Sequence, residues 1–158
     1  MAQQVDRRGL VWQLAGSCLT ATCYGSPRAA VFDAMIDWVR GSGVKVAGVV
    51  FEDRRGWIES LRLSRVRHLG RELGVPVVLL ADSPLVWMVV WLSRRLGHDL
   101  HTSRRGDVDA ALLRLSVPEA QQATVKAAVH ALRVARALGG SRRRRSSDGS
   151  SQTPVPVG

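Results

Sequence analysis

Ser60 is the first residue whose surroundings suggest chemistry. It follows a predicted strand that ends near Asp53, and it precedes a predicted helix that carries Arg62 and Arg65. Backbone N–H groups and the helix dipole stabilise a phosphate at a helix N-terminus, and nearby arginines add charge-assisted hydrogen bonds. Ser60 is therefore a candidate phosphorylation site that switches a partner on or off. The alternative is an ordinary N-cap serine, which binds the first backbone N–H groups of its helix.

The arginines around Ser60 are the second candidate, because positive charge along a helix edge fits a nucleic-acid backbone. The chain has 23 Lys plus Arg against 13 Asp plus Glu, a formal charge of +10, and only Lys45 and Lys126 are lysine. No aromatic ladder accompanies the arginines, so a solvated helix face competes with nucleic-acid binding, which is not favoured. The predicted basic face consists of Arg54, Arg55, Arg62 and Arg65.

Two tryptophans on one predicted helix are the third candidate. Trp87 and Trp91 are four residues apart and therefore lie along one face of a helix from Pro84 to Leu96, with Met88 between them. That helix is apolar on every side, whereas a helix that covers a sheet needs only one apolar stripe. Its other faces are buried either by the C-terminal helix or by a second subunit or partner, for which Trp and Met are favoured anchors. The sequence leaves both alternatives open.

We find no metal-binding or catalytic motif in the sequence. His98 and His101 form a close histidine pair, but on a strand their rings point to opposite faces, which is unsuited to chelation. Cys18 and Cys23 make no Cys-x-x-Cys motif, and we expect free thiols. A Walker loop, a Rossmann glycine motif and a nucleophile elbow are also missing. We therefore expect no metal, no cofactor, no catalytic residue and no enzymatic activity.

The order of apolar segments indicates how these residues are positioned. Short apolar runs alternate with helical patterns, which favours an α/β fold whose mostly parallel sheet is covered by helices. We expect one domain with about four strands and an extra C-terminal helix. The predicted strands are 10–15, 44–51, 77–81 and 98–102, and the predicted helices are 27–41, 61–73, 84–96, 108–115 and 118–138.

Composition sets the domain limits. The chain has 158 residues, of which 46% are hydrophobic, enough for one core. We expect residues 1–8 to be a disordered N-terminus, 9–140 to be the α/β domain, and 141–158 to be a disordered Arg/Ser/Pro tail. The apolar run 75–92 is interrupted at Asp82-Ser83-Pro84, so we expect a buried strand and a helix there rather than a membrane span. No signal peptide is recognised, and we expect a cytoplasmic protein.

Several of these segments resemble STAS domains, the family of sulphate transporter and anti-sigma-factor antagonist domains, in a divergent bacterial branch. Leu14-Ala15-Gly16 resembles the strand-then-glycine opening of that family, and Val46 to Asp53 resembles its central strand. The segment Val77 to Val86 resembles the late strand that turns into a helix, and His101 to Leu115 resembles the final strand and short helix. The resemblance implies a STAS-like α/β fold and a regulatory role.

In antagonists of this family, a kinase-type regulator phosphorylates a serine at the N-terminus of the helix that follows the central strand. The corresponding segment is Ile58-Glu59-Ser60-Leu61-Arg62, in which the acid and the first serine match the family motif but the second hydroxyl and the glycine do not. The resemblance therefore implies a switch at Ser60 and a protein partner. A related branch is grouped with lipid-carrier domains, which implies an apolar ligand but indicates no residues for it.

Together these features predict a non-enzymatic regulatory module that acts through protein contacts, either with a kinase-type regulator or with a second copy of itself. The first alternative is a nucleic-acid-associated protein that uses the basic face. The second alternative is a carrier of an apolar small molecule. Salt separates the first two, because affinity for DNA falls steeply with salt whereas a tryptophan-anchored contact changes little.

Overall fold

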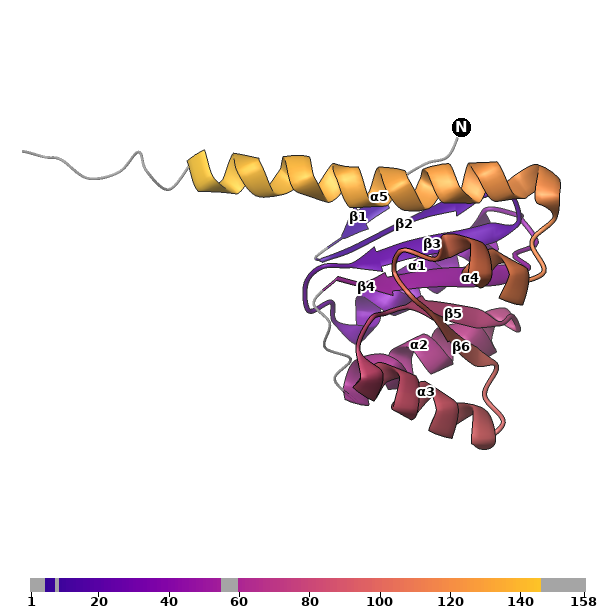
Figure 1. The fold of residues 1–158 in the computed structure, drawn as a ribbon. Coiled ribbons are helices and arrows are strands. Elements are labelled where there is room, and N and C mark those ends of the chain that lie inside the picture. The colour runs from indigo at the N-terminus through magenta and orange to yellow at the C-terminus, as the bar shows by residue number, and fades with distance from the viewer. Residues whose placement is uncertain (1–4, 8, 55–59, 146–158) are drawn as a thin grey trace, which may run out of the picture.

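The computed structural model describes the backbone of residues 5–7, 9–54 and 60–145, and the side chains of residues 9–54 and 63–135. In this part of the chain, six strands form one sheet whose spatial order is the order of the sequence (Figure 1). The first three strands are antiparallel neighbours, and from the third strand onward each neighbour is parallel. The strands are β1 (Val5–Arg7), β2 (Leu10–Ala15), β3 (Cys18–Cys23), β4 (Gly48–Asp53), β5 (Val77–Leu80) and β6 (Leu100–Ser103).

Helices cover both faces of the sheet and make three layers (Figure 1). One core lies under α1 (Ala29–Gly41), α2 (Ser60–Leu73) and α3 (Pro84–Arg95). The other core lies under α4 (Val108–Arg114) and α5 (Glu119–Arg145). Parallel strands that are joined through helices need apolar cover on both faces of the sheet. The helices provide this cover, and the predicted α/β architecture is confirmed.

The sheet differs from the prediction in its first half. The segment Cys18–Cys23, for which the sequence predicts no strand, is β3, and it is this strand rather than β2 that pairs in parallel with β4. A tight turn at Gly16, which has a φ of 58°, reverses the chain between β2 and β3. Val5–Arg7, which falls in the predicted disordered N-terminus, pairs with β2 as β1. The sheet is thus mixed and has more strands than the four predicted.

Several helix boundaries agree with the sequence. Pro84 lies in the first turn of α3, and Gly97, with a φ of 83°, follows the end of that helix. Asp107 caps α4 as expected, because its Oδ1 accepts a hydrogen bond of 3.0 Å from the N–H of Ala110. Ser83 occupies the N-cap position of α3 but makes no side-chain capping bond.

The last helix is longer than predicted. α5 runs to Arg145, whereas the glycines at 139 and 140 predict an end at Leu138. A glycine inside a helix costs only about 1 kcal/mol relative to alanine, and the arginines that follow are good helix formers. Residues 146–158 of the predicted disordered tail lie outside the described part of the chain.

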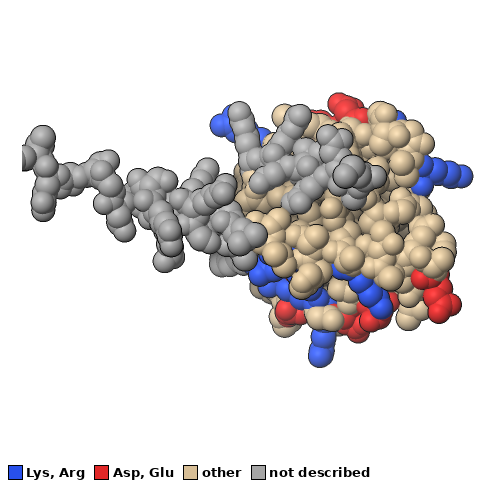
Figure 2. Space-filling model, turned by 90° about the horizontal axis from the view of Figure 1, so that it is seen from above, with Lys and Arg blue, Asp and Glu red and all other residues tan. Residues whose placement is uncertain are grey.

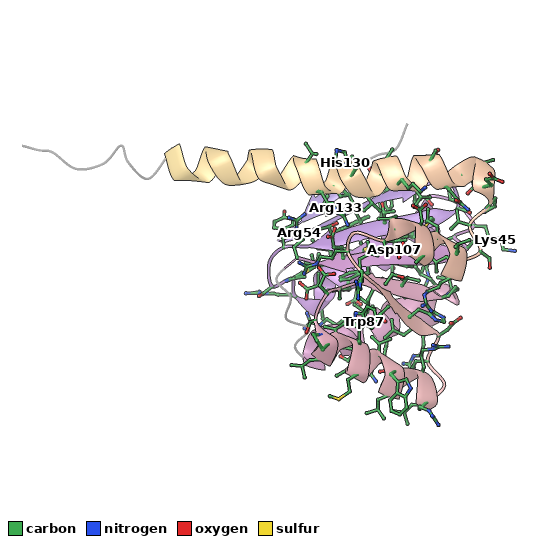
Figure 3. The ribbon with its side chains drawn as sticks, in the orientation of Figure 1. Lys45, Arg54, Trp87, Asp107, His130 and Arg133 are labelled. Atoms are coloured by element: carbon green, nitrogen blue, oxygen red, sulfur yellow. The ribbon has the colours of Figure 1, made fainter. Side chains whose placement is uncertain are left out.

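Hydrogen bonds at two positions of α5, Gln121 and Arg133, connect this helix to the sheet and its loops. Near its start, the backbone N–H and the hydroxyl of Ser17 both donate to Oε1 of Gln121, at 3.0 and 2.8 Å. The φ of 58° favours glycine at position 16, and a Cβ there would displace the Gln121 side chain from its bonds with Ser17. Further along, Arg133 reaches down from α5 toward the sheet (Figure 3).

Candidate interaction surface

α3 buries only a narrow stripe against the sheet. Val86, Val90 and Ser93 are its buried residues, and the Ser93 hydroxyl is satisfied locally by donating to the carbonyl of Val89 at 2.9 Å. The remaining surface of a helix so rich in apolar residues must then face outward.

Seven large apolar side chains are exposed on α3 and at its C-cap. Leu85 is 69% exposed, Met88 is 59% exposed and Trp91 is 57% exposed, which places them on the outer side of the helix. Because all seven side chains are large and each is about 40–70% exposed, the group offers several hundred Å² of apolar surface. The largest apolar patch on a typical monomer is about 300–600 Å². This outer α3 face consists of Leu85, Trp87, Met88, Val89, Trp91, Leu92 and Leu96.

The structure excludes one of the two covers that the sequence left open for the tryptophans. α5 lies on the opposite face of the sheet, where it contacts β2 and β3, and it does not reach α3 (Figure 1). Trp87 and Trp91 remain 40% and 57% exposed. The C-terminal helix is therefore not the element that covers them.

Each of the two tryptophans has a polar contact that favours its observed position. The indole N–H of Trp87 donates to the carbonyl of Ala81 at 2.9 Å, and this side chain points back toward the end of β5 (Figure 3). The guanidinium of Arg95 lies 4.8 Å from the ring centroid of Trp91. Prearranged aromatic side chains lose little conformational entropy on binding, which makes them good anchors for a partner.

The charge around the outer α3 face is positive. Arg94 and Arg95 lie in the last turn of the helix, and the sequence from Pro84 to His98 contains no acidic residue. The acids just beyond its ends are engaged elsewhere. Asp82 Oδ1 accepts from the backbone N–H of Arg105 at 3.1 Å, and Asp99 Oδ1 lies 2.7 Å from Nε2 of His101.

The residues of the predicted basic face are used in different ways. Arg54 is exposed at the edge of the sheet (Figure 3). Arg65 is half-buried: its Nη1 donates to the carbonyl of Pro27 at 2.6 Å, and its guanidinium lies 6.0 Å from the ring centroid of Phe32. Arg65 therefore stabilises the packing of α2 against α1 and the residues before it. Arg55 lies outside the described residues, as does the side chain of Arg62.

Ser60 is the first residue of α2, whereas the sequence predicts that Ser60 precedes a helix that begins at residue 61. Its side chain lies outside the part that the structure describes, so its capping bond and its phosphate contacts stay predictions.

A buried ion pair at the carboxyl end of β4 was not identified from the sequence. Glu52 is 2% exposed, and its Oε2 accepts from Nε of Arg133 at 3.0 Å. Nη2 of Arg133 also donates to the carbonyl of Arg105 at 2.7 Å, and Arg105 in turn donates to the carbonyl of Asp53. These bonds tie α5 and the β6–α4 connection to the end of β4. Only a non-local contact could have revealed them, since Glu52 and Arg133 are 81 positions apart.

The cysteines and histidines of the described residues do not form a common site. Cys18 and Cys23 are buried in different cores. Burial raises the pKa of the Cys18 thiol to about 12, although a backbone hydrogen bond with Val50 acts in the opposite direction. Among the described residues, no group of three or more His, Cys, Asp or Glu side chains is arranged to hold a metal ion. Within the same ranges, no helix has the length and apolarity needed to cross a membrane.

The described residues of the face that carries α5 show no clustered positive charge in Figure 2. Seen from above, its middle is largely uncharged and the described arginines and lysines lie toward its rim (Figure 2). A phosphate backbone needs clustered positive charge along its path.

No family model, no curated protein and no solved structure matches this chain.

Proposed function

We propose that this protein is a non-enzymatic regulatory module that binds another protein through the outer α3 face. The observation that carries the proposal is the exposure of seven large apolar side chains on α3 and at its C-cap. An apolar surface of several hundred Å² can form the centre of a standard protein–protein interface, to which each partner contributes roughly 800 Å² of total surface. Trp and Met, which this face supplies, are enriched in such interfaces.

The charge of the face supports one kind of partner. Arg94 and Arg95 border the apolar surface, and the chain as a whole has a formal charge of +10. A second copy would bring the same positive charge to the interface. A partner that places an apolar groove or helix face between acidic side chains complements both properties and associates faster through electrostatic steering. The proposed partner is therefore an acidic protein with an apolar contact surface.

The STAS resemblance is part of this proposal. The order of elements supports this part of the proposal: β2 precedes Gly16, α3 follows β5, and α4 follows β6. Ser60 at the start of α2 is the proposed phosphorylation switch, because the helix dipole favours a phosphate there. In this proposal, the kinase-type regulator that phosphorylates Ser60 is also the acidic protein that binds the outer α3 face.

Site-specific crosslinking tests the proposal and identifies the partner in the same experiment. A photo-crosslinking amino acid replaces Leu92, at the centre of the outer α3 face, in cells of the native organism. The matched control carries the same amino acid at Leu113 on α4, which is 72% exposed and lies on the other side of the sheet. We expect one acidic protein to crosslink at position 92 and not at position 113. The crosslinked site in the partner should contain apolar residues flanked by Asp or Glu.

Other outcomes would contradict the proposal. Crosslinks from position 92 to a second copy of this chain would identify a homodimer, and crosslinks to lipid would identify a membrane surface. Equal crosslinking from both positions would show that the outer α3 face has no special role. Recovery of nucleic acid that is lost at high salt would favour the nucleic-acid alternative.

A further inference from the structure

α5 continues beyond the part of the domain that it covers. It packs on β2 and β3, and Arg133 connects it to Glu52 at the carboxyl end of β4. From Arg133 to Arg145 the helix rises about 18 Å further, at about 1.5 Å per residue. Figure 1 shows this last part of α5 extending away from the sheet and the other helices. We refer to residues 136–145 as the projecting end of α5.

Positive charge is concentrated in the projecting end. It contains Arg136 and the run from Arg142 to Arg145, and the sequence has no acidic residue from position 120 to position 147. Lys126 and Arg133, nearer to the sheet, each form an ion pair with a described carboxylate. The charge of α5 is therefore neutralised over the sheet, whereas the sequence supplies no acidic residue next to the arginines of the projecting end.

The arginine run does not form a stripe on one side of the helix. Successive positions of an α-helix are about 100° apart, so positions 142–145 occupy all of its sides. The run is preceded by Gly139, Gly140 and Ser141, which supply no large apolar side chain. A helix that lies on a membrane needs an apolar face, and a helix that docks in a protein groove needs apolar anchors at helical spacing. The sequence of residues 139–145 has neither.

Duplex DNA presents negative charge to more than one side of such a helix. Its major groove is about 12 Å wide and admits an α-helix, whose diameter with side chains is about 10–12 Å. Phosphates line both edges of the groove, and arginine forms forked hydrogen bonds with phosphate oxygens. The projecting end contains arginine but no lysine. The major groove of double-stranded RNA is deep and narrow, which favours DNA as the ligand.

We infer that the projecting end of α5 binds double-stranded DNA through its phosphates, independently of base sequence. The described cations under the rest of α5 lie toward the rim of that face, so the contacts are confined to the projecting end (Figure 2). This interaction goes beyond the protein-binding function, because it uses no residue of the outer α3 face. It also uses none of the four arginines of the predicted basic face.

Fluorescence anisotropy of the full chain with a labelled DNA duplex of about 20 base pairs tests the inference between about 50 and 200 mM salt. R142Q/R143Q/R144Q/R145Q should weaken binding at least tenfold at the lowest salt. It should also reduce the slope of log affinity against log salt by about 3–4, since each phosphate contact contributes about 0.9. The matched control, R28Q/R54Q/R104Q/R114Q, removes the same charge from exposed arginines of the domain and should change affinity less than threefold.

A second variant tests whether the helix itself is needed. S141P keeps every arginine but places a proline inside α5, where it breaks the helix just before the arginine run. We expect it to weaken DNA binding at least fivefold. Its Tm should be unchanged, because residue 141 lies in the projecting end. Unchanged affinity of S141P would show that the arginines need no helix and would overturn binding in the groove.

Three competition results would also overturn the inference. These are displacement of the duplex by polyglutamate of equal charge, tighter binding to vesicles of anionic lipid than to the duplex, and tighter binding to the single strand than to the duplex. Equal loss of affinity in the two fourfold variants would show general electrostatic attraction instead of a site. Because α3 and α5 lie on opposite faces of the sheet, DNA binding and protein binding can fail separately.

Discussion

Replacing Arg133 by methionine tests how α5 is held on the sheet. Arg133 contributes the partner of Glu52, whose side chain is 3% exposed, while the side chain of Arg133 itself is 26% exposed. R133M keeps most of the aliphatic volume but leaves a buried carboxylate without its ion pair, which costs about 3–5 kcal/mol when the pair is buried. Because Arg133 is partly solvated, we expect a value near the lower limit, about 3 kcal/mol.

The reciprocal change should cost much less. E52Q leaves an arginine that is still partly in contact with water, so we expect a loss of about 1 kcal/mol, the value of one ordinary hydrogen bond. The double variant E52Q/R133M buries no charge at this position. It should therefore be more stable than R133M alone, with a coupling energy of about 2 kcal/mol.

Urea unfolding followed by circular dichroism measures all four proteins, and thermal unfolding provides a second readout. For a domain of this size, about 3 kcal/mol corresponds to a decrease in Tm of roughly 6–12 °C. Equal losses for E52Q and R133M, or a double variant whose loss is the sum of the two single losses, would refute the assignment of a buried, coupled pair to Glu52 and Arg133.

Two further predictions concern single groups. Because burial raises the pKa of the Cys18 thiol to about 12, Cys18 should resist iodoacetamide in the folded protein at pH 8 and react only on unfolding; peptide mapping that finds rapid labelling of native Cys18 would contradict this. The hydrogen bond from Arg40 holds the pKa of Glu72 below its ordinary value of 4.5, so its stabilising effect is complete above pH 4.5 and is lost as the pH falls through the lower, folded-state pKa. Unfolding of E72Q between pH 3 and pH 7 should therefore show less loss of stability on acidification than the unchanged protein, and parallel pH profiles would contradict the assignment.

Local signals in the sequence predicted the second half of the fold well. The strand at 77–80, the helix from Pro84 and the cap at Asp107 each depend on neighbouring residues: an apolar run, a proline with fixed φ, and a carboxylate three positions before the N–H that it accepts. Such features form independently of the rest of the chain.

β3 illustrates what the local signals miss. Cys18–Cys23 contains buried threonines rather than a continuous run of large apolar residues. Thr20 can be buried because its hydroxyl donates to the carbonyl of Gln13 on the neighbouring strand at 3.2 Å. That bond exists only after β2 and β3 have paired, so the sequence alone did not indicate a strand in the middle of the sheet.

The candidate surface was predicted only in part for the same reason. The sequence identified α3 as more apolar than one sheet contact requires, and it named Trp87, Met88 and Trp91. Whether these residues are exposed depends on which face of the sheet α5 covers, and the apolar periodicity of α5 contains no information on that choice. The Glu52–Arg133 pair depends on the same choice.

The affinity of the purified partner for charged variants tests the central claim most directly. M88E/L92E places two negative charges at the centre of the outer α3 face, where they oppose both apolar burial and an acidic partner. L113E/V134E makes the same changes at exposed apolar positions of α4 and α5. In isothermal titration calorimetry at two salt concentrations, we expect M88E/L92E to weaken binding about 100-fold, as for the loss of hot-spot residues, and L113E/V134E to bind like the unchanged protein. If the folded M88E/L92E variant binds with unchanged affinity, the outer α3 face is not the interaction surface and the proposed function is wrong.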